Sequence, residues 1–233
     1  MKRILCIIPA RGGSKGIPGK NLKKIDGKTL IEYAWASTHH SVNDLTVVLS
    51  SDDDAILKHA EDIGLETVRR PLELATDEAP VVAAVRHCLD VMEQRKEVTF
   101  DLIVLLQPTS PIRTRKDLDK VIALLDKGDV EGVISVVPSN EVHPARMYRL
   151  EDNKLLPLIE KQEGARRQEI APVYYRNGCY YAVRRTAFLE QNTLMPEKKY
   201  AYIMPSALLC NIDEPVDLII AEALIKAWKN NTI

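Results

Sequence analysis

The sequence lacks the cysteine patterns of a zinc site or a disulfide framework. Its four cysteines lie far apart and form no CxxC pair, so we expect Cys6, Cys88, Cys179 and Cys210 to be reduced and mostly buried. No apolar run reaches the roughly 18 residues of a membrane-spanning helix. The apolar run after Arg3 is too short for a secretory signal and has no small-residue cleavage site, so we expect a cytoplasmic protein.

The sequence also lacks a large net charge of either sign. Its 32 basic residues nearly balance 33 acidic ones, and the formal net charge is -1. General nucleic-acid and membrane-surface binders need a clear basic excess, so we expect no nucleic-acid or membrane partner. Hydrophobic residues make up 45% of the 233 positions, which is enough to build a core. That length suits one α/β domain with a modest insertion.

Several familiar catalytic motifs are missing. The chain contains neither the GxxxxGK[ST] of a Walker A loop nor the GxGxxG of a Rossmann dinucleotide site. It contains no HExxH, so zinc protease chemistry is not expected, and we assign no role to the five scattered histidines. A nucleotide site in this chain must therefore use another arrangement of residues than the Walker A or Rossmann motif.

What the sequence does contain is a regular alternation of apolar runs and amphipathic segments. The runs that predict buried strands are residues 4–8, 45–51, 101–107 and 132–137. The segments that predict helices are residues 29–39, 53–63, 79–95 and 115–128. This order predicts an α/β fold with a mostly parallel central sheet and helices on both faces.

The alternation stops at residues 138–177 and resumes at residues 178–183. The interrupted region has no clean helical pattern and contains four prolines, so we interpret it as an excursion from the sheet: Pro138, Pro144, Pro157 and Pro172. A final helix is expected over residues 214–229. Its predicted apolar stripe consists of Val216, Ile219, Ile220, Ala223 and Ala227.

The stretch "IPARGGSKGIPGKN" follows the first predicted strand. It holds four glycines, two prolines and three cations, namely Arg11, Lys15 and Lys20. Glycines let backbone amides approach an anion, and three cations suit the charge of a triphosphate. In open α/β sheets ligands bind at the carboxyl ends of the strands, where this stretch lies. The alternative is a solvated, flexible basic loop.

Polar motifs follow two further predicted strands. In "SSDDD", Asp52 is a candidate for a ligand or metal contact, whereas Asp53 and Asp54 are better explained as the start of a helix. In "LQPTSPIR", Gln107 is the better ligand contact. Its neighbours Thr109, Ser110 and Arg113 are expected on the ligand side, although the first two also suit turns and caps.

Two motifs nearer the C-terminus carry charge. Asp213, in "CNIDEPVDL", suits a Mg²⁺ ligand, because Mg²⁺ takes one or two protein carboxylates beside substrate phosphates. It suits a helix N-cap equally well. Arg166 and Arg167 suit a fork for a carboxylate, or an exposed basic turn.

Taken in order, these motifs resemble the acylneuraminate cytidylyltransferases, the CMP–sialic acid synthetase family. The resemblance covers nearly the whole chain and rests on "IIPARGGSKGIPGKN", "RRPLELATD", "LLQPTSPIR", "RRQ" followed by "YYRNGCYY", and "NIDEPVDL". It implies a single nucleotidyltransferase domain over residues 1–233, of the nucleotide-diphospho-sugar transferase type, with residues 138–177 as a small dimerisation insertion. It further implies a homodimer that joins CTP to a nine-carbon α-keto sugar acid, with Mg²⁺ as cofactor.

The resemblance also implies roles for individual residues. The nucleotide-binding set is Arg11, Gly12, Ser14, Lys15, Lys20, Asn21 and Arg70, the last two at the cytidine. The sugar-binding set is Gln107, Tyr181 and, reaching across the dimer, Arg167. The metal ligands are Asp213 and Asn211, and the catalytic set is Arg11, Lys15, Lys20 and Asp213. No residue is assigned as general base.

The chain departs from the family pattern at three places. Asn211 stands where members often carry aspartate, which puts a second metal in question, and "EAPVVAA" replaces a segment that often offers a serine to the base. Leu194 and Met195 stand where an aromatic pair is expected near the sugar, which favours a diacylated bacterial relative of sialic acid. Two alternatives remain: a sugar-1-phosphate nucleotidyltransferase, and a non-catalytic CTP-binding relative, which Asn211 favours.

Overall fold

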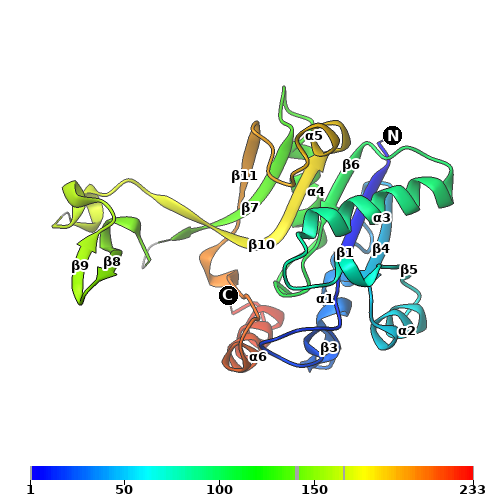
Figure 1. Ribbon diagram of the computed structural model, residues 1–233, viewed down its shortest axis with the longest axis horizontal. Helices are drawn as coiled ribbons and strands as arrows, with labels where there is room; N and C mark the ends of the chain where they lie inside the picture. Colours follow the sequence, from blue (N-terminus) through cyan, green and yellow to red (C-terminus); the bar gives the residue numbers. More distant parts are fainter. Residues whose placement is uncertain (1, 140–141, 165, 233) are drawn as a thin grey trace.

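A seven-stranded mixed sheet forms the centre of the computed structural model, which describes residues 2–139, 142–164 and 166–232 (Figure 1). Neighbouring strands run parallel except around β10, which is antiparallel to both β6 and β7. The prediction of a mostly parallel sheet is confirmed. In sheet order the strands are β11 (Lys199–Ile203), β7 (Gly132–Ser139), β10 (Val173–Arg184), β6 (Leu102–Leu105), β1 (Ile4–Pro9), β4 (Leu45–Ser51) and β5 (Glu66–Arg69).

Helices cover both faces of the sheet because alternate residues of each central strand point to opposite sides. In β1, Ile4, Cys6 and Ile8 pack into the core under α1, α2 and α4, whereas Leu5 and Ile7 pack under α3 and α5. The helices are α1 (Leu30–Ala36), α2 (Asp54–Asp62), α3 (Val81–Lys96), α4 (Arg115–Leu124), α5 (Arg185–Gln191) and α6 (Pro215–Lys229).

The helix ends follow local capping chemistry. Asp53 is the N-cap of α2 and accepts a hydrogen bond from the Ile56 amide, so its explanation as a helix start is confirmed. Gly64 follows α2 with φ +82°, a left-handed conformation that glycine adopts without strain. Pro80 is the N-cap of α3. Both α1 and α4 end earlier than predicted, since turns follow them.

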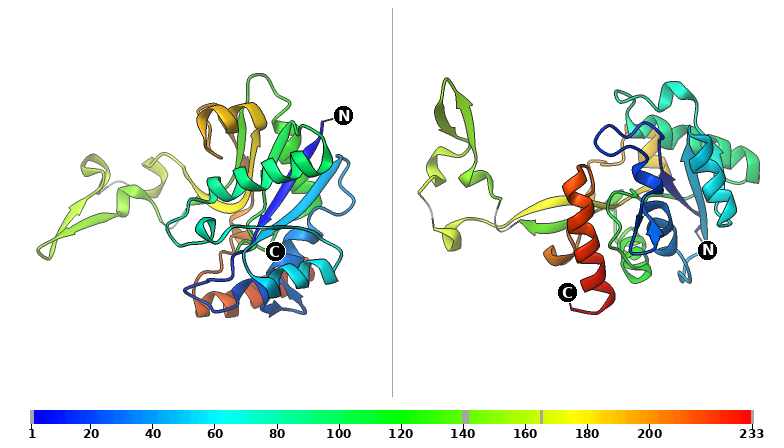
Figure 2. Two further views of the ribbon diagram at one scale, coloured as in Figure 1. Left: turned by 45° about the vertical axis from the view of Figure 1, so that its right-hand side comes forward. Right: turned by 90° about the horizontal axis from the view of Figure 1, so that it is seen from below.

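The predicted excursion is an arm that projects from the sheet (Figures 1 and 2). It is shorter than residues 138–177, because β7 continues to Ser139 and β10 already begins at Val173. Its described part contains short 3₁₀ turns and the hairpin of β8 (Tyr148–Glu151) and β9 (Lys154–Pro157). The other small ribbon, β2 (Lys24–Ile25) with β3 (Lys28–Thr29), lies just before α1.

The predicted apolar stripe of α6 is wrong about which face is buried. Ala221 and Ile225 pack against the core, whereas Val216, Ile219 and Ile220 are exposed. The helix carries apolar residues around most of its circumference, so the 3.6-residue period alone could not select the buried side. The exposed stripe lies beside the root of the arm, where Ile220 shares a groove with Val142.

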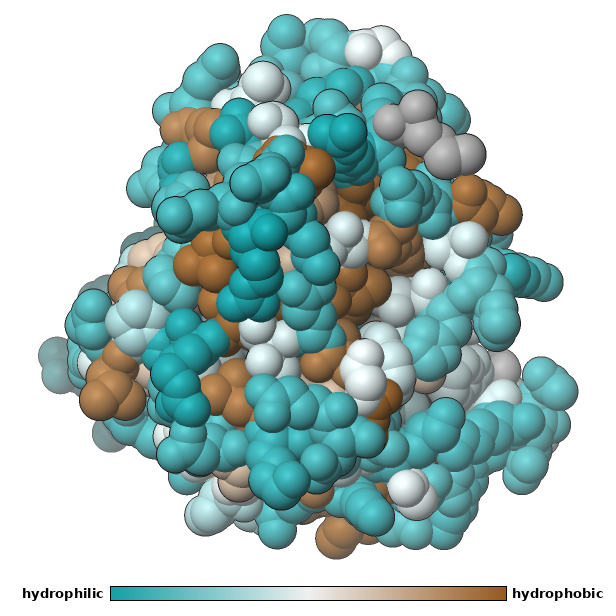
Figure 3. All heavy atoms as spheres, turned by 90° about the vertical axis from the view of Figure 1, so that its right-hand side faces the viewer, coloured by the Kyte–Doolittle hydropathy of each residue, from teal (hydrophilic) through white to brown (hydrophobic). Residues whose placement is uncertain are grey.

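The four cysteines are free and buried, as predicted. Burial raises the pKa of the thiols of Cys6, Cys88 and Cys210 to about 12, so they stay protonated and unreactive at neutral pH. No helix in the described part of the chain is long and apolar enough to cross a membrane. On the face that carries the β5 edge, hydrophilic side chains dominate and apolar ones lie in hollows between them (Figure 3).

Candidate functional site

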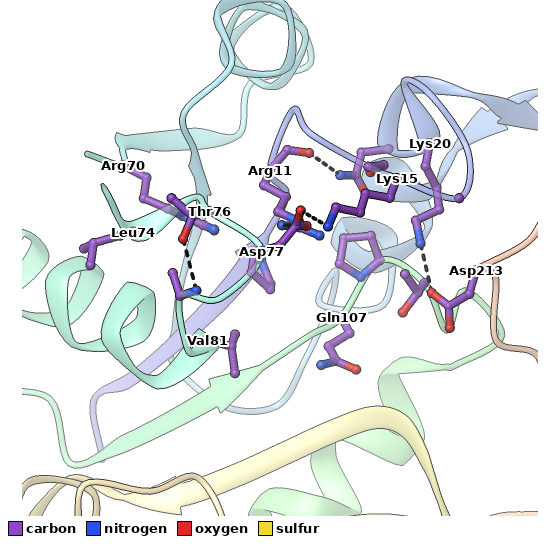
Figure 4. A pocket seen from close by; sticks show the side chains of 17 residues that line it. Arg11, Lys15, Lys20, Arg70, Leu74, Thr76, Asp77, Val81, Gln107 and Asp213 are labelled. Carbon is purple, nitrogen blue, oxygen red and sulfur yellow. Dashed lines mark hydrogen bonds and ion pairs between the residues drawn. The ribbon is translucent and has the colours of Figure 1, made fainter. Parts of the chain in front are cut away.

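A cavity of about 400 Å³ opens at the carboxyl ends of β1, β5 and β6 (Figure 4). Parallel strands bring these ends to one edge of the sheet, which is why motifs far apart in sequence meet there. The lining residues come from the loop after β1, the segment between β5 and α3, the turn after β6 and the segment before α6. Those predicted from the sequence are Arg11, Ser14, Lys15, Lys20, Asn21, Arg70, Gln107, Thr109 and Asp213.

The loop after β1 is held in place rather than freely solvated. The Gly12 amide donates to Asp52 Oδ1 at 3.1 Å, and the Asn21 side chain donates to the Arg11 carbonyl at 3.1 Å. Gly12 therefore braces the loop and does not line the cavity, in contrast to its predicted place in the nucleotide set. Asp52 likewise supports the loop.

Each cation of the loop faces a carboxylate across the cavity. Arg11 Nη1 and Lys15 Nζ lie 2.6 Å from Oδ1 and Oδ2 of Asp77, respectively. Lys20 Nζ lies 3.0 Å from Asp213 Oδ1 and donates to the Ile212 carbonyl at 2.7 Å. Hydrogen bonds from Lys15 and Arg11 lower the pKa of Asp77 below its ordinary value. Asp77 is the last residue of "RRPLELATD", to which the sequence alone assigned no individual role.

The loop also approaches the segment before α6 very closely at Gly16. A Cβ placed on Gly16 would lie 2.1 Å from the Asp213 carbonyl oxygen, whereas a Cβ on Gly13 would meet nothing within 4 Å. Only a residue without a side chain allows this approach, which keeps Lys20 and Asp213 on the same side of the cavity.

We expect Gly16→Ala to lower kcat/KM for the nucleotide by at least about tenfold, since the methyl group must push the loop away from Asp213. Gly13→Ala is the matched control and should stay close to wild type. Steady-state kinetics and thermal melting of both variants check this. Equal activities for the two variants would contradict the close approach.

One end of the cavity contains a buried arginine. Arg70 is 6% exposed and donates to Ser50 through Nε, at 3.1 Å to Oγ, and through Nη2, at 2.9 Å to the carbonyl. Burial lowers its pKa, and the nearby charge of Asp52 partly offsets this effect. Ala79 and Val81 line the same end of the cavity. A planar ring bound at this end would contact the apolar side chains of Ala79 and Val81 and the backbone at the start of α3.

A second cavity of about 390 Å³ adjoins the first, and Gln107 lines both. Its other walls come largely from β10, whose antiparallel direction carries Arg176–Gly178 to the edge where β6 ends. Tyr181 lies there as predicted, and burial raises the pKa of its phenol, which therefore stays protonated. Gly178 has φ +76°, and a Cβ on it would lie 2.9 Å from Gln107 Oε1.

Arg176 is a residue of the second cavity that sequence reasoning missed. Its Nη1 lies 2.6 Å from Met195 Sδ, a weak acceptor that leaves most of the guanidinium donors to the cavity. Leu194, by contrast, is buried in the core and lines neither cavity. The cationic residue was recognisable only as part of "YYRNGCYY", because a register shift between Arg176 and Tyr181 breaks the alternation by which strand residues point to opposite faces.

Three further predictions have different outcomes. Arg113 was expected on the ligand side, but it is buried and donates to the carbonyls of Ser110, Gln107 and Cys179. It stabilises the turn instead. Thr109 lines the first cavity, as expected for the ligand side, and its carbonyl accepts from the Ile212 amide at 3.0 Å. The side chain of Arg167 lies outside the described part of the chain, so its sugar-binding role stays a prediction.

Asp213 is not a helix cap, which removes one of its two explanations. Glu214 is the N-cap of α6 and forms a capping box with Asp217. The Asn211 amide donates to Asp213 Oδ2 and orients this carboxylate. Among the described residues no group of three His, Cys, Asp or Glu side chains could hold a metal. A cation at Asp213 would therefore need oxygen atoms from a substrate.

Comparisons with known proteins agree with this geometry. A family model described as Cytidylyltransferase matches residues 5–230. A protein named pseudaminic acid cytidylyltransferase from Campylobacter jejuni subsp. jejuni is 29% identical, over 95% of this chain and 96% of its own. An N-acylneuraminate cytidylyltransferase from Streptococcus agalactiae serotype V is 29% identical over 92% of this chain, which spans 51% of that relative.

A solved structure titled CMP:2-keto-3-deoxy-manno-octonic acid synthetase complexed with CTP has the same fold. Its TM-score is 0.70 at 18% identity, over 97% of this chain and 99% of its own. The family match extends across the strands, the cationic loop and the segment that carries Asp213. The chain therefore belongs to the cytidylyltransferase family and is a nucleotidyltransferase.

Proposed function

We propose that the protein transfers the CMP group of CTP to a nine-carbon α-keto sugar acid of the sialic, legionaminic or pseudaminic type, releasing pyrophosphate. The observation that carries the proposal is the pair of adjoining cavities that share Gln107. One is lined by three loop cations and suits a nucleoside triphosphate. The other is polar, contains one guanidinium, and suits a hydroxylated acid.

At the nucleotide end, Arg11, Lys15 and Lys20 would hold the triphosphate, with Ser14 donating beside them. Charge-assisted hydrogen bonds of this kind are stronger than neutral ones, and they place the reacting phosphate. Arg70 and Asn21, both buried at the cavity wall, would contact the cytidine.

At the sugar end, Arg176 would bind the carboxylate that all α-keto sugar acids carry. Gln107 and Tyr181 would donate to sugar hydroxyls, since the phenol of Tyr181 remains protonated. Arg167 would reach the sugar from the other copy in a homodimer. Met195 touches Arg176 and would set the room left for the substituents of the sugar.

The reaction forms one P–O bond and breaks another, and the hydroxyl also loses its proton, which passes to solvent. The oxygen of the anomeric hydroxyl attacks the α-phosphorus of CTP, and the bond from this phosphorus to the β-phosphate oxygen breaks as pyrophosphate leaves. The described lining of the second cavity contains no carboxylate and no imidazole. We assign no side-chain base, and the chain contributes positioning and charge stabilisation, as is usual in phosphoryl transfer.

Mg²⁺ is the proposed cofactor, and the donor set fits it. Asp213 offers a carboxylate that is 61% exposed at the rim of the cavity, beside Lys20. Asn211 adds an amide oxygen as a second possible ligand. One or two protein ligands with phosphate oxygens are typical of Mg²⁺ sites. When bound, the ion would neutralise charge on the phosphates.

Pyrophosphate release tests the proposed function. We expect release when CTP and Mg²⁺ are mixed with N-acetylneuraminate, legionaminate or pseudaminate, with the preferred acid identifying the sugar. A sugar 1-phosphate as sole acceptor would support the alternative nucleotidyltransferase. Tight CTP binding without release with any acceptor would support the non-catalytic alternative. Either outcome would overturn the proposal.

We also propose a homodimer, because the chain exposes apolar surfaces at the root of the arm, on α6 and at the hairpin of the arm. A groove of about 390 Å³ lies between the root of the arm and α6, with Val142, Leu209 and Ile220 among its walls. The α6 stripe continues it, and the hairpin of the arm exposes Leu150, Leu155 and Leu156. Large exposed apolar patches are typical of interaction surfaces in soluble proteins.

Ile219→Glu should shift the protein from dimer to monomer, since it places a charge in the middle of the apolar stripe. Ile219 is 73% exposed, and Val42, on the loop between α1 and β4, is 77% exposed, so Val42→Glu is the matched control. Light scattering after size exclusion measures the mass of both. A monomeric wild type, or an Ile219→Glu dimer as stable as the Val42→Glu one, would count against the interface.

A further inference from the structure

We propose that Asp77 is an internal counter-ion, which occupies Arg11 and Lys15 while the cavity is free and is displaced by the triphosphate of CTP. The inference rests on the proposed function in one respect, namely that this cavity takes a triphosphate. It adds a residue that controls nucleotide affinity and product release without being part of the nucleotide contacts.

The geometry matches the way a phosphate would bind. Asp77 directs one oxygen to Arg11 Nη1 and the other to Lys15 Nζ, both at 2.6 Å, and so bridges two cations as a phosphate does (Figure 4). The Lys15 side chain is 77% exposed, yet its ammonium group turns to Asp77. Asp77, Arg11 and Lys15 all line the cavity assigned to the triphosphate.

Asp77 is not needed to hold the loop in its conformation. The loop backbone is braced independently by the Gly12–Asp52 and Asn21–Arg11 hydrogen bonds, neither of which involves Asp77. Asp77 itself lies on the segment between β5 and α3, just after the short 3₁₀ helix Leu72–Leu74. Side-chain ion pairs near the surface are worth little, so a multiply charged ligand can replace them.

Bound CTP and an unmoved Asp77 would place like charges side by side on the same two cations, which is unfavourable at short distance. The carboxylate must therefore leave when the triphosphate enters. It can return when pyrophosphate departs, and it then competes with the product for Arg11 and Lys15. We infer that Asp77 weakens anion binding and speeds the release of pyrophosphate.

Calorimetric titration with tripolyphosphate, without CTP, sugar or metal, tests the proposal. Asp77→Asn removes the competing charge with little change of shape, and we expect tripolyphosphate to bind about five- to tenfold more tightly than to wild type. The inhibition constant of pyrophosphate in the forward reaction should fall by a similar factor. A residue that merely supports the structure would change affinity in the opposite direction when lost.

Two variants separate the local ion pairs from overall charge. Glu78→Gln changes the net charge by the same amount as Asp77→Asn, but Glu78 is exposed and does not line the cavity. The affinity of this variant for tripolyphosphate should therefore stay within about twofold of wild type. Asp77→Glu keeps the charge and should remain nearer to wild type than Asp77→Asn does. Near-UV circular dichroism verifies that each variant is folded.

The outcomes distinguish this inference from the proposed function. Weaker or unchanged tripolyphosphate binding by Asp77→Asn, or the same gain in Asp77→Glu or Glu78→Gln, would overturn the counter-ion role. If the wild type and all variants bind no tripolyphosphate, the triphosphate site itself is wrong, and the counter-ion role fails with it.

Discussion

Lys20→Met is expected to lower kcat with CTP by about 100-fold, the size of effect seen when one charged donor to a developing negative charge is removed. Lys20 is the most buried cation of the loop, with its side chain 13% exposed. Its ammonium group joins the loop to the segment before α6 through Asp213 and the Ile212 carbonyl. The variant loses both a phosphate contact and this connection.

Lys23→Met is the matched control for Lys20→Met. Lys23 is three residues further along the chain, exposed, and outside the lining of either cavity described above. Steady-state kinetics should show near-normal turnover for this control. Circular dichroism and thermal melting should show that both proteins fold. A folded Lys20→Met protein with normal turnover would refute the triphosphate role of Lys20.

Asp213→Asn should reduce turnover by at least about 100-fold and weaken divalent-cation binding in parallel. The substitution keeps the shape of the side chain and removes its charge. Because the described residues contain no group of three metal-ligating side chains, the loss of this carboxylate should weaken the metal site strongly. It also leaves Lys20 without its ion-pair partner. Titration of Mn²⁺ by electron paramagnetic resonance, with CTP present, measures metal affinity separately from activity.

Glu214→Gln is the control for Asp213→Asn. Glu214 lies next in the chain and caps α6, and glutamine keeps an acceptor for that cap while removing the same charge. Manganese affinity should therefore stay near that of wild type. Equal loss of manganese affinity in both variants would show that α6 as a whole, rather than the carboxylate of Asp213, controls the site.

Most of the sheet and half of the site could be predicted from the sequence because both depend on local patterns. Continuous apolar runs predicted β1, β4, β6 and β7, and the glycines and cations after β1 predicted an anion site. Gln107 and Asp213 were found because residues at the carboxyl ends of neighbouring strands converge whatever the details of packing.

The rest depended on contacts between distant segments. Asp77 and Arg176 reach their cavities from an irregular segment and from an antiparallel strand, so no periodicity indicated where they point. Arg113 was misplaced since its partners are backbone carbonyls, two of which belong to its own turn and one to β10. The buried face of α6 was misplaced because apolar residues surround that helix.

The sequence by itself determined the α/β order of elements, the cationic loop at the end of the first strand and the carboxylate before the last helix. Only the tertiary structure decided which carboxylate faces which cation: Asp77 across from Arg11 and Lys15, and Asp213 across from Lys20. Charge and hydropathy along the chain indicate which side chains can form ion pairs and which can be buried. The packing of the strands and loops selects those partners, because attraction between charges is strong only at close range.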